Sequence, residues 1–383
     1  MVLLTGAQLV MLVGPTVPLP APALLTEAVE RVEVTQSDTG PSGFQIVFKA
    51  GRGQPFNPVD YPLLQSPLLK PFNRIILLLR IGVMLHVLFD GIMTDRQFTP
   101  GTEPGAAILT VTGEDVSVML DLEEKVVAHP AQNEVMIATK IIASYARYGL
   151  IPMVIPPPTL DLPLPTERVP VQHGTDLAYL RDMAARYAYD FYLTPGPAPG
   201  ASTAYWGPPQ RLGLLQRALT FNMGPQTNLN SINFRYDALA PQKVMGRVDD
   251  RRTDQVLPLR TLASTRPPLS RAPALLTQSH VRTTWRSNVG GLTATDALTR
   301  VQADTNVSAD RVVTAAGEVD VIRYGGILEA RRLVGVRGVG DTFDGLYYVR
   351  QVTHVIEPGT STYRQQFTLT REGVGTLTPV VVP

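Results

Sequence analysis

The sequence contains no cysteine and almost no excess of charge of either sign. The lack of cysteine excludes disulfide frameworks, thiolate zinc sites and cysteine nucleophiles. Lysine and arginine total 34 while aspartate and glutamate total 33, so the net charge is +1. Proteins that bind nucleic acid usually carry a basic excess that neutralises phosphates. We therefore expect no nucleic-acid partner.

Long uninterrupted apolar segments are also missing. Residues 75–89 are largely apolar, but Arg80 and His86 interrupt them, and a membrane-spanning helix needs about 20 mostly apolar residues. Residues 1–13 lack the basic residues that precede the apolar core of a secretory signal. The first segment predicts two adjoining buried strands and the second predicts a strand after a short arm. We expect no stable membrane insertion.

Motifs for catalysis or cofactor binding are absent from the sequence. There is no P-loop and no Gly-x-Ser-x-Gly segment. A glycine-rich run lacks dinucleotide-binding spacing and predicts a turn, and a group of carboxylates predicts a solvated charged turn rather than a glycosidase pair. No histidine has a second ligand at metal-binding spacing, so we predict no enzyme, catalytic residue, cofactor or metal. The residues considered are Gly335, Gly338 and Gly340; Asp121, Glu123 and Glu124; and His86, His129, His173, His280 and His354.

Proline and glycine are abundant, with 34 and 31 of the 383 residues. Because proline costs about 3 kcal/mol inside a helix, this composition favours many strands that end in turns. Apolar and charged residues alternate over 29–34, a Gly-Pro-Ser-Gly turn follows, and residues 44–48 are again strand-like, which predicts a β-hairpin. A further strand is predicted over 108–111. The length predicts two to three domains.

Helical periodicity is clear in two central segments. Asn133 is a suitable N-cap for a helix that ends at Tyr148, and Thr175 is one for a helix that ends at Tyr187. A third and weaker helix is predicted over 294–303. These helices lie between strand-rich regions, so the predicted fold class is mainly β with an α+β insertion.

Two segments rich in proline, glycine or arginine predict loops at domain boundaries. The first covers residues 195–209 around Tyr205 and Trp206, and the second covers residues 253–273. An exposed Tyr-Trp pair in a loop would suit a carbohydrate-binding adhesin, which is one alternative function. A tail-associated peptidoglycan hydrolase is another, although the sequence offers it no acid/base site.

A short pattern, Phe-Asp-Gly followed by Arg-Gln, occurs twice with an offset of 343 − 89 = 254. Ala-Pro-Ala-Leu-Leu-Thr also occurs twice, with an offset of 272 − 21 = 251. These nearly equal offsets predict an internal duplication in which both Asp-Gly pairs form tight hairpin turns. The two arginines are then interface candidates at corresponding places, or else only solvated strand ends. The residues are Phe89, Asp90, Gly91 and Arg96, and Phe343, Asp344, Gly345 and Arg350.

Several stretches, in order, resemble the late control D proteins of phages, the baseplate hub family that also forms the first part of type VI secretion spike proteins. Residues 88–94 resemble the family's apolar-Phe-Asp-Gly strand end. Residues 171–191 resemble its central helix, with Gln172, Thr175 and Asp176 in place. Residues 233–236 and 343–367 resemble later strands of its barrels. The resemblance covers about residues 23–373.

The resemblance implies two tube-forming β-barrels related by internal duplication, assembled as a homotrimer with pseudo-sixfold symmetry. The implied partners are the hexameric tail tube, a trimeric spike and other baseplate proteins, within a phage tail or contractile injection particle built in the bacterial cytoplasm. Because the chain stops at Pro383 without a needle-like extension, we expect the spike to be a separate protein. The expected parts are an N-terminal arm (1–22), a first barrel (23–125, with help from 210–250), an inserted α/β domain (126–209) and a second barrel (251–383, with a helical insert near 290–325).

Overall fold

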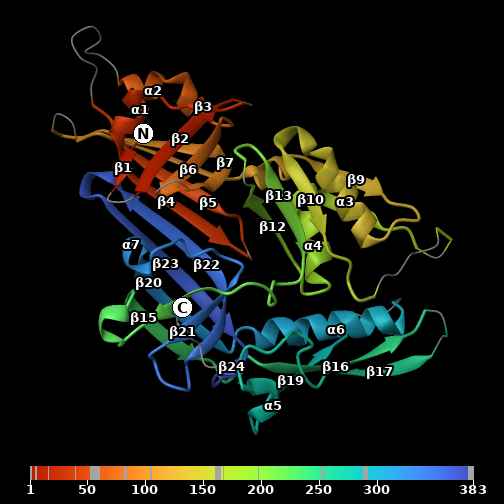
Figure 1. The fold of residues 1–383 in the computed structure, drawn as a ribbon. Helices are drawn as coiled ribbons and strands as arrows, with labels where there is room; N and C mark the ends of the chain where they lie inside the picture. Colours follow the sequence, from red (N-terminus) through yellow and green to blue (C-terminus); the bar gives the residue numbers. More distant parts are fainter. Residues whose placement is uncertain are drawn as a thin grey trace.

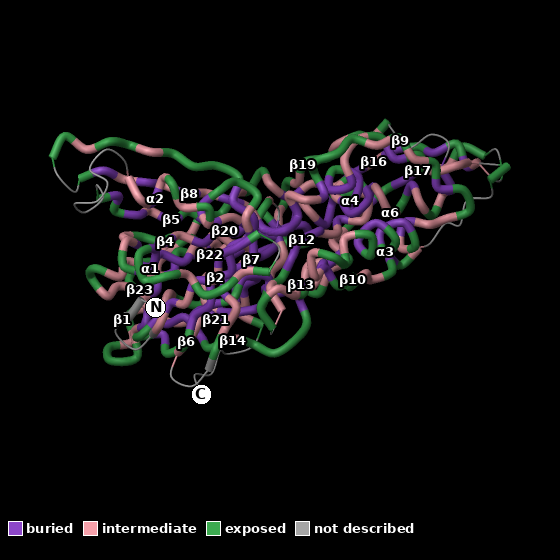
Figure 2. The backbone as a smooth tube through the Cα atoms, turned by 90° about the horizontal axis from the view of Figure 1, so that it is seen from above, coloured by how far each residue is buried: buried purple, intermediate pink, exposed green. Residues whose placement is uncertain are grey.

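The computed structural model describes residues 2–4, 7–15, 17–38, 40–51, 61–81, 84–103, 106–159, 165–166, 168–196, 198–251, 253, 255–287 and 292–377. The described part of the chain is mostly strand, which confirms the predicted fold class. Fourteen of its strands join into one sheet, and the remaining elements form two smaller units (Figure 1). The sheet has two halves, and both smaller units lie on the same side of it (Figures 1 and 2).

The first half of the sheet is built from the N-terminal part of the chain. Its strands follow one another in the order β1-β2-β6-β7-β8-β5-β4, with antiparallel pairing throughout. Short helices cover one face and complete an apolar core. The strands are β1 (Val2–Leu4), β2 (Ala7–Gly14), β3 (Leu19–Pro20), β4 (Val29–Ser37), β5 (Gly43–Lys49), β6 (Arg74–Ile81), β7 (Met84–Thr99) and β8 (Ile108–Asp115), and the helices are α1 (Ala23–Ala28), α2 (Pro62–Gln65) and η1 (Pro67–Leu69).

The second half continues the same sheet in the order β22-β23-β20-β15, and β21 and β14 extend it beside β22. β14 runs parallel to β21, whereas β2 runs antiparallel to β6 in the first half. The strands are β14 (Gln216–Thr220), β15 (Leu229–Tyr236), β20 (Val313–Asp320), β21 (Leu333–Arg337), β22 (Gly345–Glu357) and β23 (Thr362–Arg371), with the short helices η4 (Gly224–Gln226), α7 (Val321–Tyr324) and η5 (Pro358–Thr360).

The first insertion, residues 116–207, lies between the two halves in sequence. Its helices pack on the three-stranded sheet β10-β13-β12, and β9 pairs with β11. Asn133 and Thr175 cap the helices as predicted. Its elements are η2 (Val116–Leu120), β9 (Glu124–Ala128), α3 (Glu134–Ser144), η3 (Ala146–Tyr148), β10 (Leu150–Val154), β11 (Val171–Thr175), α4 (Asp176–Ala185), β12 (Asp190–Pro195) and β13 (Ser202–Gly207).

The second insertion, residues 237–312, interrupts the second half between β15 and β20. The sheet β17-β16-β19 packs against a long helix that Thr293 caps. This helix is six residues longer than predicted, because its buried face continues through Thr305, Asn306 and Ser308 to Ala309. The elements are β16 (Gln242–Asp249), β17 (Val256–Arg260), β18 (Ala272–Pro273), α5 (Ala274–Thr277), β19 (Arg282–Arg286) and α6 (Ala294–Ala309), and β18 pairs with β24 (Gly373–Val374) near the C-terminus.

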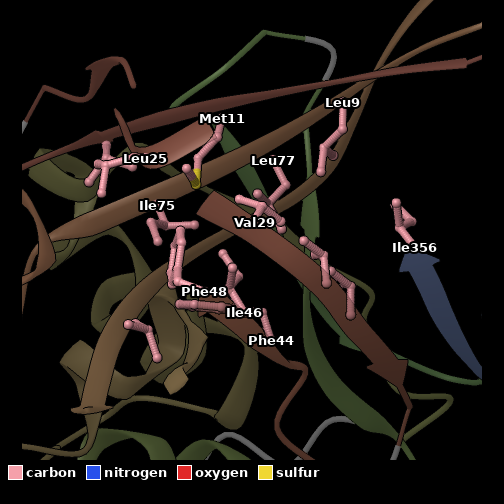
Figure 3. Close-up of a cluster of buried hydrophobic side chains, with 14 of the residues drawn as sticks. Leu9, Met11, Leu25, Val29, Phe44, Ile46, Phe48, Ile75, Leu77 and Ile356 are labelled. Carbon is pink, nitrogen blue, oxygen red and sulfur yellow. The ribbon is translucent and has the colours of Figure 1, made fainter. Parts of the chain in front are cut away.

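Apolar residues on alternate positions of the first half point into one core. Figure 3 shows Leu9 and Met11 of β2 and Leu77 of the neighbouring β6 converging with side chains of β5. Ile356, from β22 of the second half, also belongs to this core. The pair of strands predicted within residues 75–89 and the hairpin predicted over 29–48 are both confirmed.

Three sequence-based boundaries need correction. Residues 7–14, assigned to an N-terminal arm, form β2, which pairs with β6 along its whole length. Residues 210–250 contribute to the second half and its insertion rather than to the first half, because β14 pairs with β21 and β15 with β20. Residues 202–207, predicted as loop, form β13, and Trp206 is fully buried there.

Leu180→Ala tests the core of the first insertion. Leu180 is fully buried on α4, so the truncation should lower the free energy of unfolding by ~2–5 kcal/mol. Chemical denaturation would measure this change. Leu214→Ala, at a residue that is 95% exposed, is the matched control and should change stability by less than about 0.5 kcal/mol. Equal effects of the two substitutions would contradict this packing.

Candidate assembly surfaces

The two halves are joined by a seam in which β4 and β22 pair antiparallel. Six residue pairs make this seam, from Gln351 with Ser37 to Ile356 with Val32. On one face the hydroxyl oxygens of Thr35 and Thr353 lie 3.0 Å apart. The seam makes one continuous sheet of the two halves.

The other face of the seam is buried between the two cores. Val34 and His354 pair there, with exposed fractions of 0% and 1%. The imidazole Nδ1 lies 2.8 Å from the Tyr363 hydroxyl. Burial lowers the pKa of His354 to about 3, so the ring is neutral and packs as a polar member of the core. His86, on β7, is only half-buried.

Both halves carry β-bulges, and the bulges lie at matching places. In the first half the extra residues are Glu30 in β4 and Thr94 in β7. In the second half they are Asn230 in β15 and Arg350 in β22. An extra residue interrupts a ladder at one defined position, so these four bulges fix how the halves correspond. β4, β5, β6, β7 and β8 correspond to β15, β20, β21, β22 and β23.

A row of residues across each half gives the same correspondence independently. In each row, the residue on the outer strand (β4 or β15) lies four positions after the bulge of that strand. The residue on the inner strand (β7 or β22) lies one position before the bulge of that strand. The first row is Val34, Phe44, Gly113 and Met93, and the second is Phe234, Ala315, Leu369 and Val349. The two halves therefore share strand order and direction across five strands, and register across the four strands of these rows.

The sequence repeat identified the right strands but the wrong register. The bulges relate β7 to β22 by 350 − 94 = 256 positions, whereas the Phe-Asp-Gly match has an offset of 254. The second match also fails, because residues 21–26 precede β4 whereas residues 272–277 lie inside the second insertion. The correspondence of the halves rests on their sheet topology.

Asp90 and Gly91 do not form the predicted hairpin turn. They lie within β7, paired with Ile76 and Ile75 of β6. A Cβ atom on Gly91 would lie 2.4 Å from the Phe89 ring and 2.3 Å from the Glu114 carbonyl oxygen. Glycine is thus needed here for close approach rather than for turn geometry.

The Asp90 carboxylate instead forms a buried, bidentate ion pair. Arg74 donates to it from Nε and Nη2 at 2.7 Å each, and also donates to the Gly200 carbonyl in the first insertion at 3.1 Å. Burial raises the pKa of Asp90, and the Arg74 guanidinium opposes this shift. The pair links the first half of the sheet to the first insertion.

Asp344 and Gly345 lie where the connection between β21 and β22, residues 338–344, meets β22, and not in a two-residue hairpin. Gly345 has a φ of +123° at the start of β22, and the Asp344 carboxylate accepts from the Val339 amide at 2.9 Å. Phe343 stacks on Phe234 with ring centroids 4.7 Å apart. Phe89 contacts Phe44 instead, so the two phenylalanines are not equivalent.

The two predicted interface arginines are not equivalent either. Arg350 is the bulged residue of β22 and forms an ion pair with Asp38 at 3.2 Å. Arg96 lies two residues beyond the bulge of β7, is exposed, and donates to the Leu64 carbonyl at 3.2 Å. Arg350 therefore has a partner within its own chain, and only Arg96 lies on an open strand edge.

Arg331 is a buried cation at the meeting point of both halves and the first insertion. Its guanidinium donates to the carbonyl oxygens of Ser37, at 2.6 Å, and Leu193, at 2.7 Å, and lies 3.9 Å from the centroid of the Tyr192 ring. Burial lowers the pKa of Arg331, while nearby Tyr192 opposes the shift. No sequence motif marked this residue.

Beside this junction the two insertions and the sheet enclose a cavity of about 690 Å³. Asp190 lines it, and its buried Oδ2 atom has no hydrogen-bond partner among the described residues. Burial, followed by the neighbouring Asp38 carboxylate, raises the pKa of Asp190 to about 7. Arg266 and Arg350 line the same cavity and oppose this shift.

Away from the insertions, the face of the sheet opposite the cores is polar. Across both halves it carries threonine, glutamine and paired charges, such as Arg364 with Glu318 at 3.7 Å and Arg364 with Glu357 at 3.8 Å. We call this surface the polar sheet face. It includes Thr35, Gln45, Thr112, Asp95 and Gln97 in the first half and Ser231, Glu318, Gln351, Thr353, Gln366 and Thr368 in the second.

Within the described ranges no helix is long and apolar enough to cross a membrane. No group of three histidine or carboxylate residues gathers there as a metal site.

No family model and no curated relative matches the chain. Solved structures do. The chain is similar to the tail protein from Neisseria meningitidis MC58, with a TM-score of 0.65 and 12% identity over 97% of this chain and 98% of that one. It is also similar to the 43 kDa tail protein of prophage MuSo2 from Shewanella oneidensis, with a TM-score of 0.61 and 14% identity over 95% and 98%. The E. coli c3393 protein, a type VI secretion component, matches with a TM-score of 0.53 and 11% identity over 93% and 77%. The chain therefore has the fold of these phage tail and secretion proteins.

Asp190→Asn tests the buried carboxyl. With a pKa raised above its unfolded value, Asp190 keeps in the folded state a proton that the unfolded chain releases near pH 4. Wild-type stability should then fall as the pH rises from 4 to 7, by up to about 1.4 kcal/mol per pH unit. The amide variant lacks this loss, so its stability relative to wild type should rise over that range and level off above pH 7. Chemical denaturation of both proteins at pH 5, 6, 7 and 8 gives the difference between their free energies of unfolding. Titration of His354 contributes equally to both proteins and therefore cancels in this difference. Parallel curves would show that Asp190 is ionised throughout.

Proposed function

We propose that the chain is a structural hub of a phage-tail-like baseplate and acts without catalysing a reaction. Its place is a phage tail or contractile injection particle, assembled in the bacterial cytoplasm. Two observations support the class of function: the fold is that of phage tail proteins over nearly the whole chain, and the polar face is shared by two matched halves.

The duplication of the sheet is the observation that carries the proposal. Three copies of a chain with two matched halves supply six similar sheets around one axis. Heterologous contacts close into a ring when the rotation per copy permits it. Such a homotrimer can meet a hexameric tail tube on one side and a trimeric spike, as a separate protein, on the other. Other baseplate proteins would contact the insertions.

The polar sheet face is the surface that would face the channel of this ring. Its ion pairs, such as Arg31 with Glu357 at 3.9 Å, balance the charge locally. Neutral hydroxyl and amide side chains fill most of the remainder. A wall of this kind offers neither a basic track for nucleic acid nor an apolar patch that would hold cargo.

The carbohydrate-binding alternative loses its sequence support. It depended on Tyr205 and Trp206 in an exposed loop, but both side chains are buried in β13 and Trp206 donates to the Leu180 carbonyl at 3.1 Å. A hydrolase would need a positioned acid/base pair, for which the sequence offers no motif.

Native mass spectrometry on purified particles and on the isolated chain tests the assembly. The expected species has three times the 41.7 kDa mass of one chain. A pull-down with peptidoglycan fragments, followed by analysis for cleaved muropeptides, should give neither retention nor cleavage. A stable monomer or dimer within the particle would overturn the hub proposal, and glycan cleavage would favour the hydrolase.

A further inference from the structure

We infer that copies of the chain join edge to edge, with β15 of one copy pairing antiparallel with the C-terminal part of β7 of the next. The inference rests on the proposed trimer and adds to it the two edges, their direction and their register. It comes from the seam between β4 and β22, which supplies a template inside a single chain.

Among the described residues, both edges are open in one copy. β15 ends the sheet, since β20 is the only described strand that pairs with it. β7 pairs with β8 along residues 91–99 and with β6 only up to Ile92. Because the β6 and β8 ladders overlap at residues 91–92, they lie on opposite edges of β7. Beyond Met93 no described strand occupies the β6 edge.

The corresponding edge in the second half is occupied. β22 pairs with β23 over residues 348–357, with β21 over residues 345–348 and with β4 over residues 351–356. The overlaps place β21 and β4 one after the other on the edge opposite β23. β7 corresponds to β22, and β6 to β21. The open part of β7 is therefore the place that β4 fills on β22.

The strand that corresponds to β4 is β15, and its outer edge is also open. Within one copy, β15 lies at the far end of the sheet from the first half, as Figure 1 shows. It must therefore reach an open β7 edge on another copy. Three copies joined in this way form a closed ring of six half-sheets. Around the ring, the seam within each copy alternates with a seam between copies. Open strand edges are otherwise prone to unspecific pairing.

The bulges fix the register of the new seam. The bulges place each residue of β22 256 positions after its counterpart in β7 (350 − 94), and each residue of β15 200 positions after its counterpart in β4 (230 − 30). Replacing each residue of the internal seam by its counterpart gives the intermolecular pairs. His354 with Val34 becomes Phe98 with Phe234 of the next copy, and Thr353 with Thr35 becomes Gln97 with Arg235. The remaining pairs are Asp95 with Asp237, Arg96 with Tyr236, Thr99 with Asn233 and Pro100 with Ile232.

The side chains on the core face fit this register. Phe98 and Phe234 are both half-buried in one copy, where Phe98 contacts Tyr61 and Phe234 stacks on Phe343, each with ring centroids 4.7 Å apart. Pairing the two joins these aromatic clusters into one buried row. Beside them the exposed Arg96 guanidinium would meet the ring of Tyr236, which is 40% exposed, in a cation–π contact.

The polar face of the new seam carries both signs of charge. Asp95 and Asp237 would lie opposite each other at the end of the ladder, which is unfavourable for two carboxylates. Arg235 lies two residues away on the same face and already pairs with Asp237 at 3.4 Å. In this register Arg235 lies beside Asp237 on its own strand and diagonally across from Asp95. Its positive charge can therefore offset the repulsion between the two carboxylates.

Disulfide trapping tests the register cleanly, because the natural chain has no cysteine. We would combine Phe98→Cys with Phe234→Cys in one chain, and Gln97→Cys with Arg235→Cys in another. Neighbouring antiparallel pairs alternate between hydrogen-bonded and non-hydrogen-bonded types, and the latter bring side chains closer. At least one double variant should therefore oxidise into a covalent trimer on a non-reducing gel, and reductant should return it to monomer. The matched control, Phe98→Cys with Ser231→Cys, is displaced by three residues and should stay monomeric, as should each single variant.

The outcomes separate the inference from the function it rests on. Native mass spectrometry of the reduced variants reports whether the trimer forms, and circular dichroism reports whether each variant folds. A trimer in which only the displaced pair cross-links, or in which no pair cross-links, overturns the seam and leaves the hub proposal standing. A folded monomer under reducing and oxidising conditions overturns both. Covalent trimers from a predicted pair, without any from the displaced pair, support the inferred seam.

Discussion

The pairing of β4 with β22 is the constraint on which the rest of the structure depends. Six residue pairs turn two sheets into one, and β22 also contributes to the core of the first half, since Ile356 belongs to that cluster of buried side chains (Figure 3). At the same junction the Arg331 guanidinium donates a hydrogen bond to the carbonyl oxygen of Ser37, the last residue of β4. A backbone ladder with a shared core has one register, because a slip by one residue would expose the apolar side chains of every strand in it.

That single register explains why buried polar groups are tolerated at the seam. His354 stays neutral because burial lowers its pKa to about 3, and the Tyr363 hydroxyl lies within hydrogen-bond distance of it. Arg331 has carbonyl acceptors and an aromatic ring in place of water. Each group is specific for one arrangement of the two halves, so the junction selects geometry more than it adds stability.

Sequence reasoning predicted the elements well and the junctions poorly. Alternation revealed β4 and β5, and the caps Asn133 and Thr175 placed two helices, because these signals are local. Asp90 and Gly91 misled because their types suit a turn, yet one serves a distant arginine and the other makes room for the Phe89 ring. Trp206 misled because proline and glycine on both sides of β13 hide a central strand. The repeat could not be aligned with one offset, since the second insertion separates β15 from β20: the offset is 200 from β4 to β15, 271 from β5 to β20 and 256 from β7 to β22.

The same insertion shows how one chain can present two symmetries. Residues 38–42 connect β4 to β5, whereas the whole second insertion, with α6, lies at the corresponding point between β15 and β20. The first insertion follows β8, whereas the described residues after β23 form only the short strand β24. Both insertions lie on one side of the sheet (Figures 1 and 2). In the proposed ring, six nearly equivalent sheets would therefore line the channel, while each insertion would occur only three times. The inner surface would approximate sixfold symmetry and the side that bears the insertions would be strictly threefold, which is the property required of a part that joins a hexameric tube to a trimeric spike.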